Sequence, residues 1–133
     1  MIVVDTNIIA YLYLPTEYST QAELLLSKEP DWVTPTLWRS EFRNVLALYL
    51  RKSILTFDEA YALQTEAEAL LSHKEYDSVS YEILSLVNNS KCSAYDCEFV
   101  ALAKQLNVNL VTTDRQILKQ FSRVAISLKE ALR

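Results

Sequence analysis

The sequence contains no glycine, and this absence removes whole classes of function. Neither a Walker phosphate-binding loop nor a dinucleotide-binding fingerprint can form, because both need glycine where the backbone approaches phosphate. Tight turns must use asparagine, aspartate and serine instead, and Asn89, Asn107 and Asn109 stand at positions that need such residues. The chain also has no apolar run that reaches the roughly 18 residues needed to cross a membrane.

Cysteine and histidine are equally scarce. Cys92 and Cys97 make no disulfide framework, and with the single His73 they supply too few ligands for a zinc site. A Ser or Cys catalytic triad would have to recruit His73, which lies in the polar stretch SHKEYDS and is interpreted as a surface residue. Cys97 is interpreted as a small core or surface residue rather than a reactive thiol. The start of the chain lacks the basic segment and cleavage site of a signal peptide, so a reducing, cytoplasmic setting is expected.

Short strand patterns alternate with longer helical patterns along the chain. Strands are predicted at residues 2–4, 32–34, 109–113 and 123–126. Helices are predicted at 16–28, 36–52, 56–72, 78–90, 94–107 and 114–121, with a short one near 127–132. This alternation is typical of βαβ units, so we expect one domain over residues 1–133, with a parallel sheet covered on both faces.

Two acidic residues come directly after predicted strands. Asp5 follows the apolar run IVV, and Asp114 follows LVTT. A buried carboxylate costs several kcal/mol unless it is neutralised, so these positions need an explanation. In an open α/β sheet, ligands bind beyond the carboxyl ends of the parallel strands, and both residues are predicted to lie on that edge.

Two further acids interrupt apolar helix faces. Glu41 shares a predicted helix face with Leu37, Val45 and Leu48. Asp96 breaks its pattern in the same way, because residues four and seven positions later are Val100 and Ala103, while Glu98, Lys104 and Gln105 take the polar side. Each of the four acids also has a structural interpretation. Asp5 and Asp114 are placed to cap helices, Glu41 to pair with an arginine or lie at the edge of its stripe, and Asp96 to stabilise a first helical turn.

Together, the four carboxylates can converge on one pocket, and oxygen ligands without cysteine or histidine suit Mg²⁺ or Mn²⁺. The formal net charge of −4 by itself argues against nucleic-acid binding, because proteins that bind nucleic acid are usually basic. Removing four site acids from the 17 acidic residues leaves 13, however, which equals the number of basic residues. Paired dications are a standard device for phosphodiester cleavage, so a metal-dependent nuclease is the leading hypothesis.

The segments VVDTNIIAYL, LWRSEFRNVL, SAYDCEFVALAKQLNV and LVTTDRQIL resemble the four acidic motifs of PIN-domain nucleases, most closely the VapC-type toxins of toxin–antitoxin systems. The resemblance implies a three-layer α/β/α fold with a central parallel sheet of four to five strands. It implies a Mg²⁺- or Mn²⁺-dependent endoribonuclease, with Asp5, Glu41, Asp96 and Asp114 as the catalytic metal ligands.

The resemblance also extends to residues and partners around the site. It assigns Asn7 and Thr112 to orienting the ligands, and it implies a homodimer, an RNA substrate and a cognate antitoxin protein. Typical members carry glycine in the turn that matches Leu106-Asn107-Val108, and this chain does not. We expect Asn107 to adopt the left-handed geometry in its place.

Contacts to substrate are less specific in the sequence. Arg39, Arg43 and Arg115 lie next to the acids and are candidates to hold RNA phosphates, or else to neutralise carboxylates or point into solvent. Trp38 and the eight tyrosines are candidates for base stacking, although Trp38 fits the apolar stripe of its helix. Two alternative functions remain: a catalytically silent PIN-like binding module, and a phosphatase of the haloacid dehalogenase type, against which the Asn at position 7 counts.

Overall fold

A five-stranded parallel sheet lies at the centre of the protein, in a computed structural model that describes residues 1–133. The strands are β1 (Ile2–Val4), β2 (Trp32–Pro35), β3 (Glu75–Tyr76), β4 (Leu110–Val111) and β5 (Ala125–Ile126). Their order across the sheet is β3-β2-β1-β4-β5, and every neighbouring pair is parallel. The predicted parallel sheet is therefore confirmed, and β3 is a strand that the sequence pattern did not indicate.

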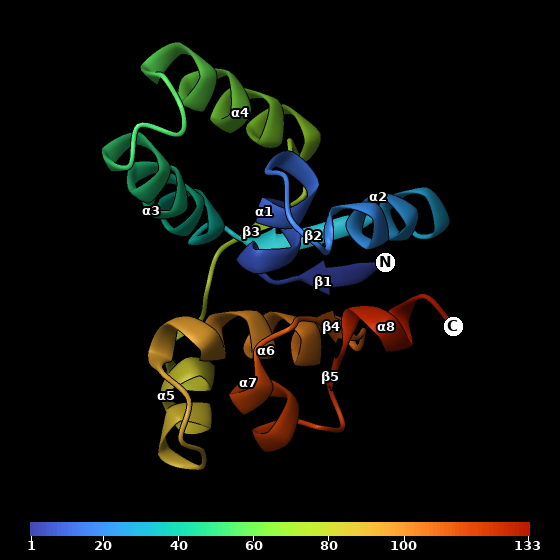
Figure 1. The fold of residues 1–133 in the computed structure, drawn as a ribbon. Helices are drawn as coiled ribbons and strands as arrows, with labels where there is room; N and C mark the ends of the chain where they lie inside the picture. Colours follow the sequence, from blue (N-terminus) through green and yellow to red (C-terminus); the bar gives the residue numbers. More distant parts are fainter.

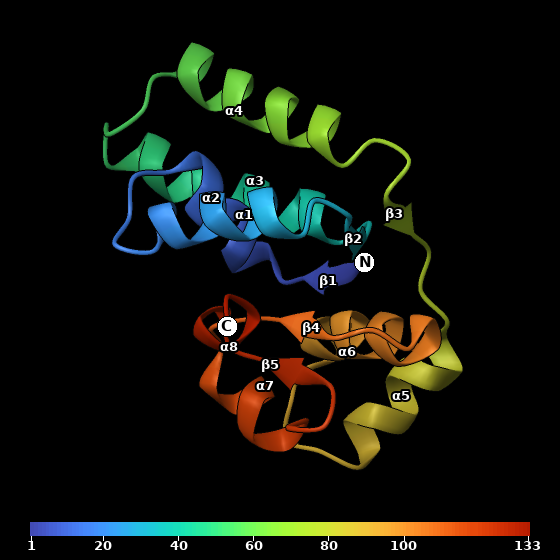
Figure 2. The same cartoon turned by 90° about the vertical axis from the view of Figure 1, so that its right-hand side faces the viewer.

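Eight helices connect and flank the strands (Figure 1). They are α1 (Thr6–Tyr13), α2 (Ser19–Lys28), α3 (Trp38–Arg51), α4 (Phe57–Leu70), α5 (Ser80–Asn88), α6 (Ala94–Leu106), α7 (Arg115–Gln120) and α8 (Leu128–Ala131). The seven predicted helices are all present, and α1 is additional. In both views α1–α4 gather on one side and α5–α8 on the other, and the two halves meet where β1 pairs with β4 (Figure 2).

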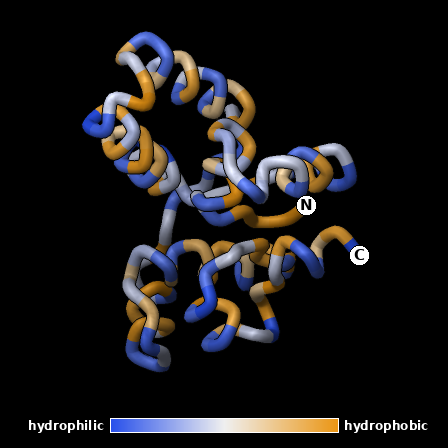
Figure 3. Tube along the Cα trace, viewed as in Figure 1, coloured by the Kyte–Doolittle hydropathy of each residue, from blue (hydrophilic) through white to orange (hydrophobic).

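The apolar core is built around the short central strands. Val3, Val4, Leu110 and Val111 have no exposed surface, and β1 is uniformly hydrophobic along its length (Figure 3). Burial of an aliphatic side chain of this size stabilises the fold by about 1.5–3 kcal/mol. Helix α6 packs against β1, β2 and β4, and so the helix that carries Asp96 rests directly on the sheet. No helix in the structure is long and apolar enough to span a bilayer.

Three non-glycine residues take over the backbone conformation that glycine usually supplies. Ser53, His73 and Asn107 have φ values of 57°, 64° and 55°. Asn107 ends α6 in the left-handed region, at φ 55° and ψ 47°, as the glycine-free sequence predicted. Asparagine tolerates this region better than most residues with a Cβ, because its short polar side chain can bond locally. His73 is exposed, as expected.

Candidate active site

The four anomalous acids line a single open pocket of about 550 Å³. Asp5 directly follows β1, and Asp114 is the third residue after the end of β4. Glu41 lies in the first turn of α3, and Asp96 lies in the first turn of α6. The pocket lies at the carboxyl edge of the parallel sheet, where ligand sites of open α/β folds occur. Four segments distant in sequence thus bring their carboxylates to one place.

Asp5 is the most buried of the four acids, at 9% exposure. Its Oδ1 accepts a hydrogen bond from the Thr6 amide at 2.8 Å, and its Oδ2 accepts one from the Thr112 hydroxyl at 2.6 Å. Burial raises the pKa of Asp5 to about 6, and the charges of Glu41 and Asp96 push in the same direction. The two hydrogen bonds lower the pKa of Asp5, but by less than burial raises it. A nearby positive charge would therefore stabilise the ionised carboxylate.

Glu41 is held by α1, the neighbouring helix. The Thr6 hydroxyl donates to Glu41 Oε1 at 2.7 Å, and burial raises the pKa of Glu41. The expected apolar stripe around Glu41 needs correction, because the core face of α3 consists of Trp38, Phe42 and Leu46. Leu48 is 49% exposed. Leu37 and Val45 line the pocket beside Glu41, so this face of the helix looks into the site rather than into the core.

Asp96 and Asp114 complete the lining from the other half of the chain. Burial raises the pKa of Asp96, and the charge of Asp114 adds to this effect. Asp114 is also the N-cap of α7, where its Oδ1 accepts from the Ile117 amide at 3.0 Å. Asp5 is likewise the N-cap of α1. Capping and membership of the acidic pocket therefore coexist in both residues, since a carboxylate has several lone-pair sites.

The donor set of the pocket suits a hard divalent cation. All four candidates offer carboxylate oxygens, and three of them are less acidic than usual because burial opposes their charge. Asn7 lines the same pocket, and its Oδ1 atom is buried without a hydrogen-bond partner. As the side chains stand, however, no three His, Cys, Asp or Glu residues come close enough together to hold one ion. The chemistry of the donors fits a dication, and the carboxylates need to draw together to complete its coordination.

Hydroxyl side chains hold the acids and the loop after β4 in place through hydrogen bonds. Thr112, fully buried, donates to Asp5 and accepts from the Asp114 amide at 3.0 Å, and thereby links β1 to the loop after β4. The Tyr11 hydroxyl bonds to the Thr113 hydroxyl at 2.7 Å and ties α1 to the same loop. Sequence reasoning singled out Thr112 but missed Thr6, whose signal was its place beside Asp5.

The aromatic candidates for base stacking differ in their exposure. Tyr95 is 63% exposed, and it is the one aromatic residue in the pocket lining. Trp38 is fully buried, which confirms its interpretation as a core residue and removes it as a stacking surface.

Cys92 and Cys97 are free and buried, and burial raises the pKa of the Cys92 thiol to about 11. Cys97 therefore lies in the core, one of the two places expected for it.

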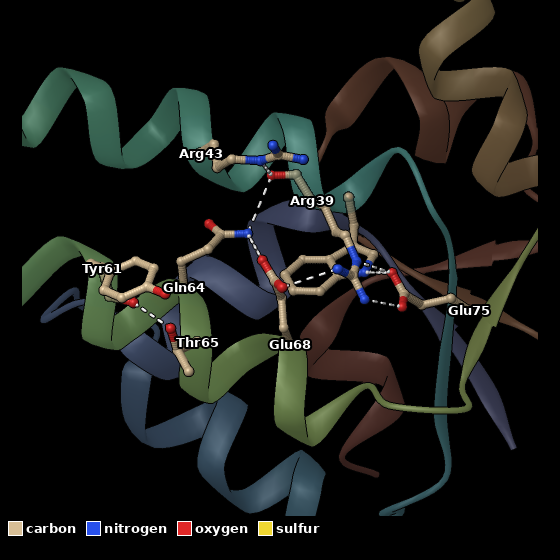
Figure 4. Close-up of polar contacts among 8 residues, drawn as sticks. Arg39, Arg43, Tyr61, Gln64, Thr65, Glu68 and Glu75 are labelled. Atoms are coloured by element: carbon tan, nitrogen blue, oxygen red, sulfur yellow. Dashed lines mark hydrogen bonds and ion pairs between the residues drawn. The ribbon is translucent and has the colours of Figure 1, made fainter.

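The three arginines have different surroundings. Arg39 donates to Glu75 and Glu68 and does not line the pocket, so its guanidinium is engaged in ion pairs outside the site (Figure 4). Arg43 is exposed, and its Nε donates to the Arg39 carbonyl at 3.0 Å. Arg115 is exposed beside Asp114. Neither Arg43 nor Arg115 makes an ion pair, and neither belongs to the pocket lining.

Comparison with known proteins agrees with this geometry. The PIN domain family model matches residues 2–126. Ribonuclease VapC3 from Pyrobaculum aerophilum is 35% identical over 124 residues, which cover 90% of this chain and 94% of that protein. FitAcB from Neisseria gonorrhoeae shares the fold with a TM-score of 0.75 at 19% identity, over 97% of this chain and 99% of that one. PAE2754 from Pyrobaculum aerophilum does so with a TM-score of 0.72 at 20% identity, over 98% and 92%. The chain therefore belongs to the PIN-domain family, among its VapC-type members.

Proposed function

We propose that this protein is an endoribonuclease that uses Mg²⁺ or Mn²⁺ to cleave RNA phosphodiester bonds. The observation that carries the proposal is the gathering of Asp5, Glu41, Asp96 and Asp114 in one pocket at the carboxyl edge of the sheet. Similarity to Ribonuclease VapC3 supports the same activity. The structural cost of keeping Asp5 buried, with its raised pKa, has a direct explanation if a cation neutralises it.

The polar residues that hold or form the acidic cluster have defined tasks in this proposal. Divalent ions held by the four carboxylates would supply an activated water and stabilise negative charge on the phosphate. Thr6 and Thr112 hold Glu41 and Asp5 in fixed orientations through their hydroxyl groups. Asn7, whose buried Oδ1 lacks a partner, is placed to orient a ligand of the site.

Substrate would be held by residues close in sequence to the four acids. Arg43 and Arg115 would donate to RNA phosphates, since both are exposed and make no ion pair. Tyr95 offers an exposed ring beside Asp96 on which an unpaired base would stack. Arg39, whose guanidinium is already bonded to two carboxylates, is no longer a candidate for this task.

A toxin role with a protein antitoxin, and a homodimeric state, are part of the same proposal. The similarity to Ribonuclease VapC3 supports the toxin role, and the homodimer and the antitoxin partner are what the resemblance to VapC-type toxins implies. A short upstream gene that encodes a small DNA-binding protein would identify the candidate antitoxin. Co-purification of the two proteins, with loss of RNA cleavage in the complex, is the expected result. Light scattering of the purified chain alone measures the oligomeric state.

The decisive experiment is cleavage of a structured RNA in Mg²⁺ or Mn²⁺, with an EDTA control. Asp96→Asn keeps the shape of the side chain but removes its charge, so it should fold and lose activity. The loss should exceed the roughly 10–100-fold that follows removal of a supporting residue. Asp58→Asn, an exposed acid in the first turn of α4, is the matched control and should cleave like the wild type.

The runner-up function is a catalytically silent PIN-like binding module. It predicts that a folded protein binds Mn²⁺ or RNA without cleaving any RNA tested. Titration with Mn²⁺ separates the cases, because absence of binding would remove the four-acid metal site itself. A phosphatase of the haloacid dehalogenase type needs a second Asp two residues after the first, and this chain has Asn7 there.

A further inference from the structure

A cluster of hydrogen bonds fastens the beginning of α3 to the edge strand β3. Glu75 in β3 accepts from Trp38 Nε1 at 2.8 Å, and from Arg39 Nε and Nη2 at 2.7 Å each (Figure 4). The two parallel bonds to one guanidinium are the geometry that fixes orientation as well as distance. The Glu75 side chain is 13% exposed, so water competes little with these bonds.

This cluster anchors the start of α3 through side chains, at an end of the helix that has no side-chain cap. The N-cap of α3, Leu37, has no side chain that can accept a hydrogen bond. In contrast, α1, α4, α6, α7 and α8 each begin with a capping side chain. Trp38 and Arg39 are the first two residues of α3, so their bonds to Glu75 hold the uncapped end of the helix against the sheet.

The end of the helix that is held in this way carries Glu41. Glu41 lies three residues after Trp38 in the same turn, and its carboxylate bonds to Thr6 across the pocket. Movement of this turn would shift the Glu41 carboxylate relative to Asp5, whose place is set by β1 and Thr112. Displacements of about 1 Å at such sites are known to cost large factors in rate and affinity.

We propose that Glu75, outside the pocket, is a positioning residue that holds the first turn of α3 so that Glu41 faces Asp5. The inference rests on the proposed function, because metal binding is the task for which Glu41 is positioned. The hydrogen bond from Arg39 is the main cause that lowers the pKa of Glu75, and the hydrogen bond from Trp38 lowers it further. The Glu75 carboxylate therefore stays ionised at neutral pH.

The chain supplies a matched control in Glu68 on α4. Glu68 is the other carboxylate that binds Arg39, at 3.0 Å, but the Trp38 Nε1 donates to Glu75 and not to Glu68. We therefore compare Glu75→Gln with Glu68→Gln in two measurements: Mn²⁺ affinity by calorimetry, and amide hydrogen exchange of residues 38–42 without metal. Glu75→Gln should weaken Mn²⁺ binding by about tenfold and speed exchange in that turn. Glu68→Gln should change the affinity by less than about twofold and leave the exchange of residues 38–42 near the wild-type rate.

The outcomes separate this inference from the proposed function. Wild-type affinity in Glu75→Gln, or an equal loss in both variants, overturns the positioning role. If the wild type binds no Mn²⁺, the proposed metal site fails, and exchange of residues 38–42 alone decides whether Glu75 anchors α3. Should Glu75→Gln not fold, Arg39→Lys takes its place, since it keeps the charge but loses the planar two-point contact.

Discussion

The buried carboxylate of Asp5 gives the metal-free protein a characteristic pH dependence. Its pKa is raised from 3.8 to about 6, so between these values the folded chain holds a proton that the unfolded chain has lost. Rising pH through this window therefore reduces the stability contributed at this site, by up to about 3 kcal/mol. Carboxylates with a lowered pKa, such as Glu75, make the protein more stable as the pH rises, which is the opposite effect. The effect of Asp5 alone is therefore obtained by subtracting the unfolding free energy of Asp5→Asn from that of the wild type at each pH.

We expect metal-free Asp5→Asn to be more stable than the wild type at pH 7, by about 1–3 kcal/mol, and to lose this advantage near pH 4. Urea unfolding at a series of pH values measures the difference. Added Mn²⁺ should stabilise only the wild type, and less so below pH 6, where Asp5 takes up a proton. A constant difference between the two proteins across the pH range would contradict the raised pKa.

A second prediction at the residue scale concerns Thr112, which holds the Asp5 carboxylate in its orientation. Its hydroxyl donates to Asp5 and accepts from the Asp114 amide, and Thr112→Val removes both bonds while keeping the shape. We expect a loss of about 1–3 kcal/mol in the free energy of unfolding, because buried polar groups lose their partner. RNA cleavage should fall by about 10–100-fold.

Thr65→Val is the control for this substitution. The Thr65 hydroxyl bonds to the Tyr61 carbonyl on the exposed face of α4, far in sequence from the site acids. Its removal should change stability by less than about 0.5 kcal/mol and leave cleavage unchanged. Similar effects of the two substitutions would mean that Thr112 acts only as a packing residue.

At the scale of secondary-structure elements, the end of α6 shows how the chain forms turns without glycine. Asn107 closes this helix in the left-handed region. Asn107→Ala should lower the free energy of unfolding by about 1 kcal/mol, because a Cβ without a compensating polar group is strained there. Asn107→Gly should cost much less, since glycine enters this region freely. Thermal unfolding of both variants measures the contrast, and equal stabilities would argue against strain at this turn.

The elements that the sequence predicted are those with their own hydrophobic pattern. The strand at 2–4 and the helix at 94–107 recur almost unchanged as β1 and α6. Strand β3 has two half-buried residues, Glu75 and Tyr76, and exists only through its pairing with β2. Helix α1 was foreseen only as a segment that Asp5 would cap, because its residues continue the apolar run of β1.

In the candidate site, too, residues with a local sequence signal were predicted, whereas contacts between distant segments were not. Each of the four acids disturbs a local pattern and could be found in the sequence. Thr112 was also singled out, but the bond from Thr6 to Glu41 and the bond from Arg39 to Glu75 were not, because they span 35 and 36 positions. Contacts at such distances depend on how α1, α3 and β3 pack together, which no single segment encodes.

For the whole molecule, charge balance governs how RNA is held. The chain carries a net charge of −4, and its only unpaired arginines next to the site acids are Arg43 and Arg115. RNA binding should therefore need divalent metal and should depend only weakly on salt. Two phosphate contacts to single-stranded RNA predict a slope of about −1.4 for log affinity against log salt concentration.

Fluorescence anisotropy with a 2′-O-methyl RNA in Mn²⁺ tests this prediction, with the integrity of the RNA checked on a gel afterwards. Arg43→Gln and Arg115→Gln should each make the slope shallower by about 0.7, because each removes one phosphate contact. Arg133→Gln, at the exposed end of the chain, should leave the slope unchanged. A steep slope that neither site variant alters would mean that RNA lies on another face of the molecule, away from the four carboxylates.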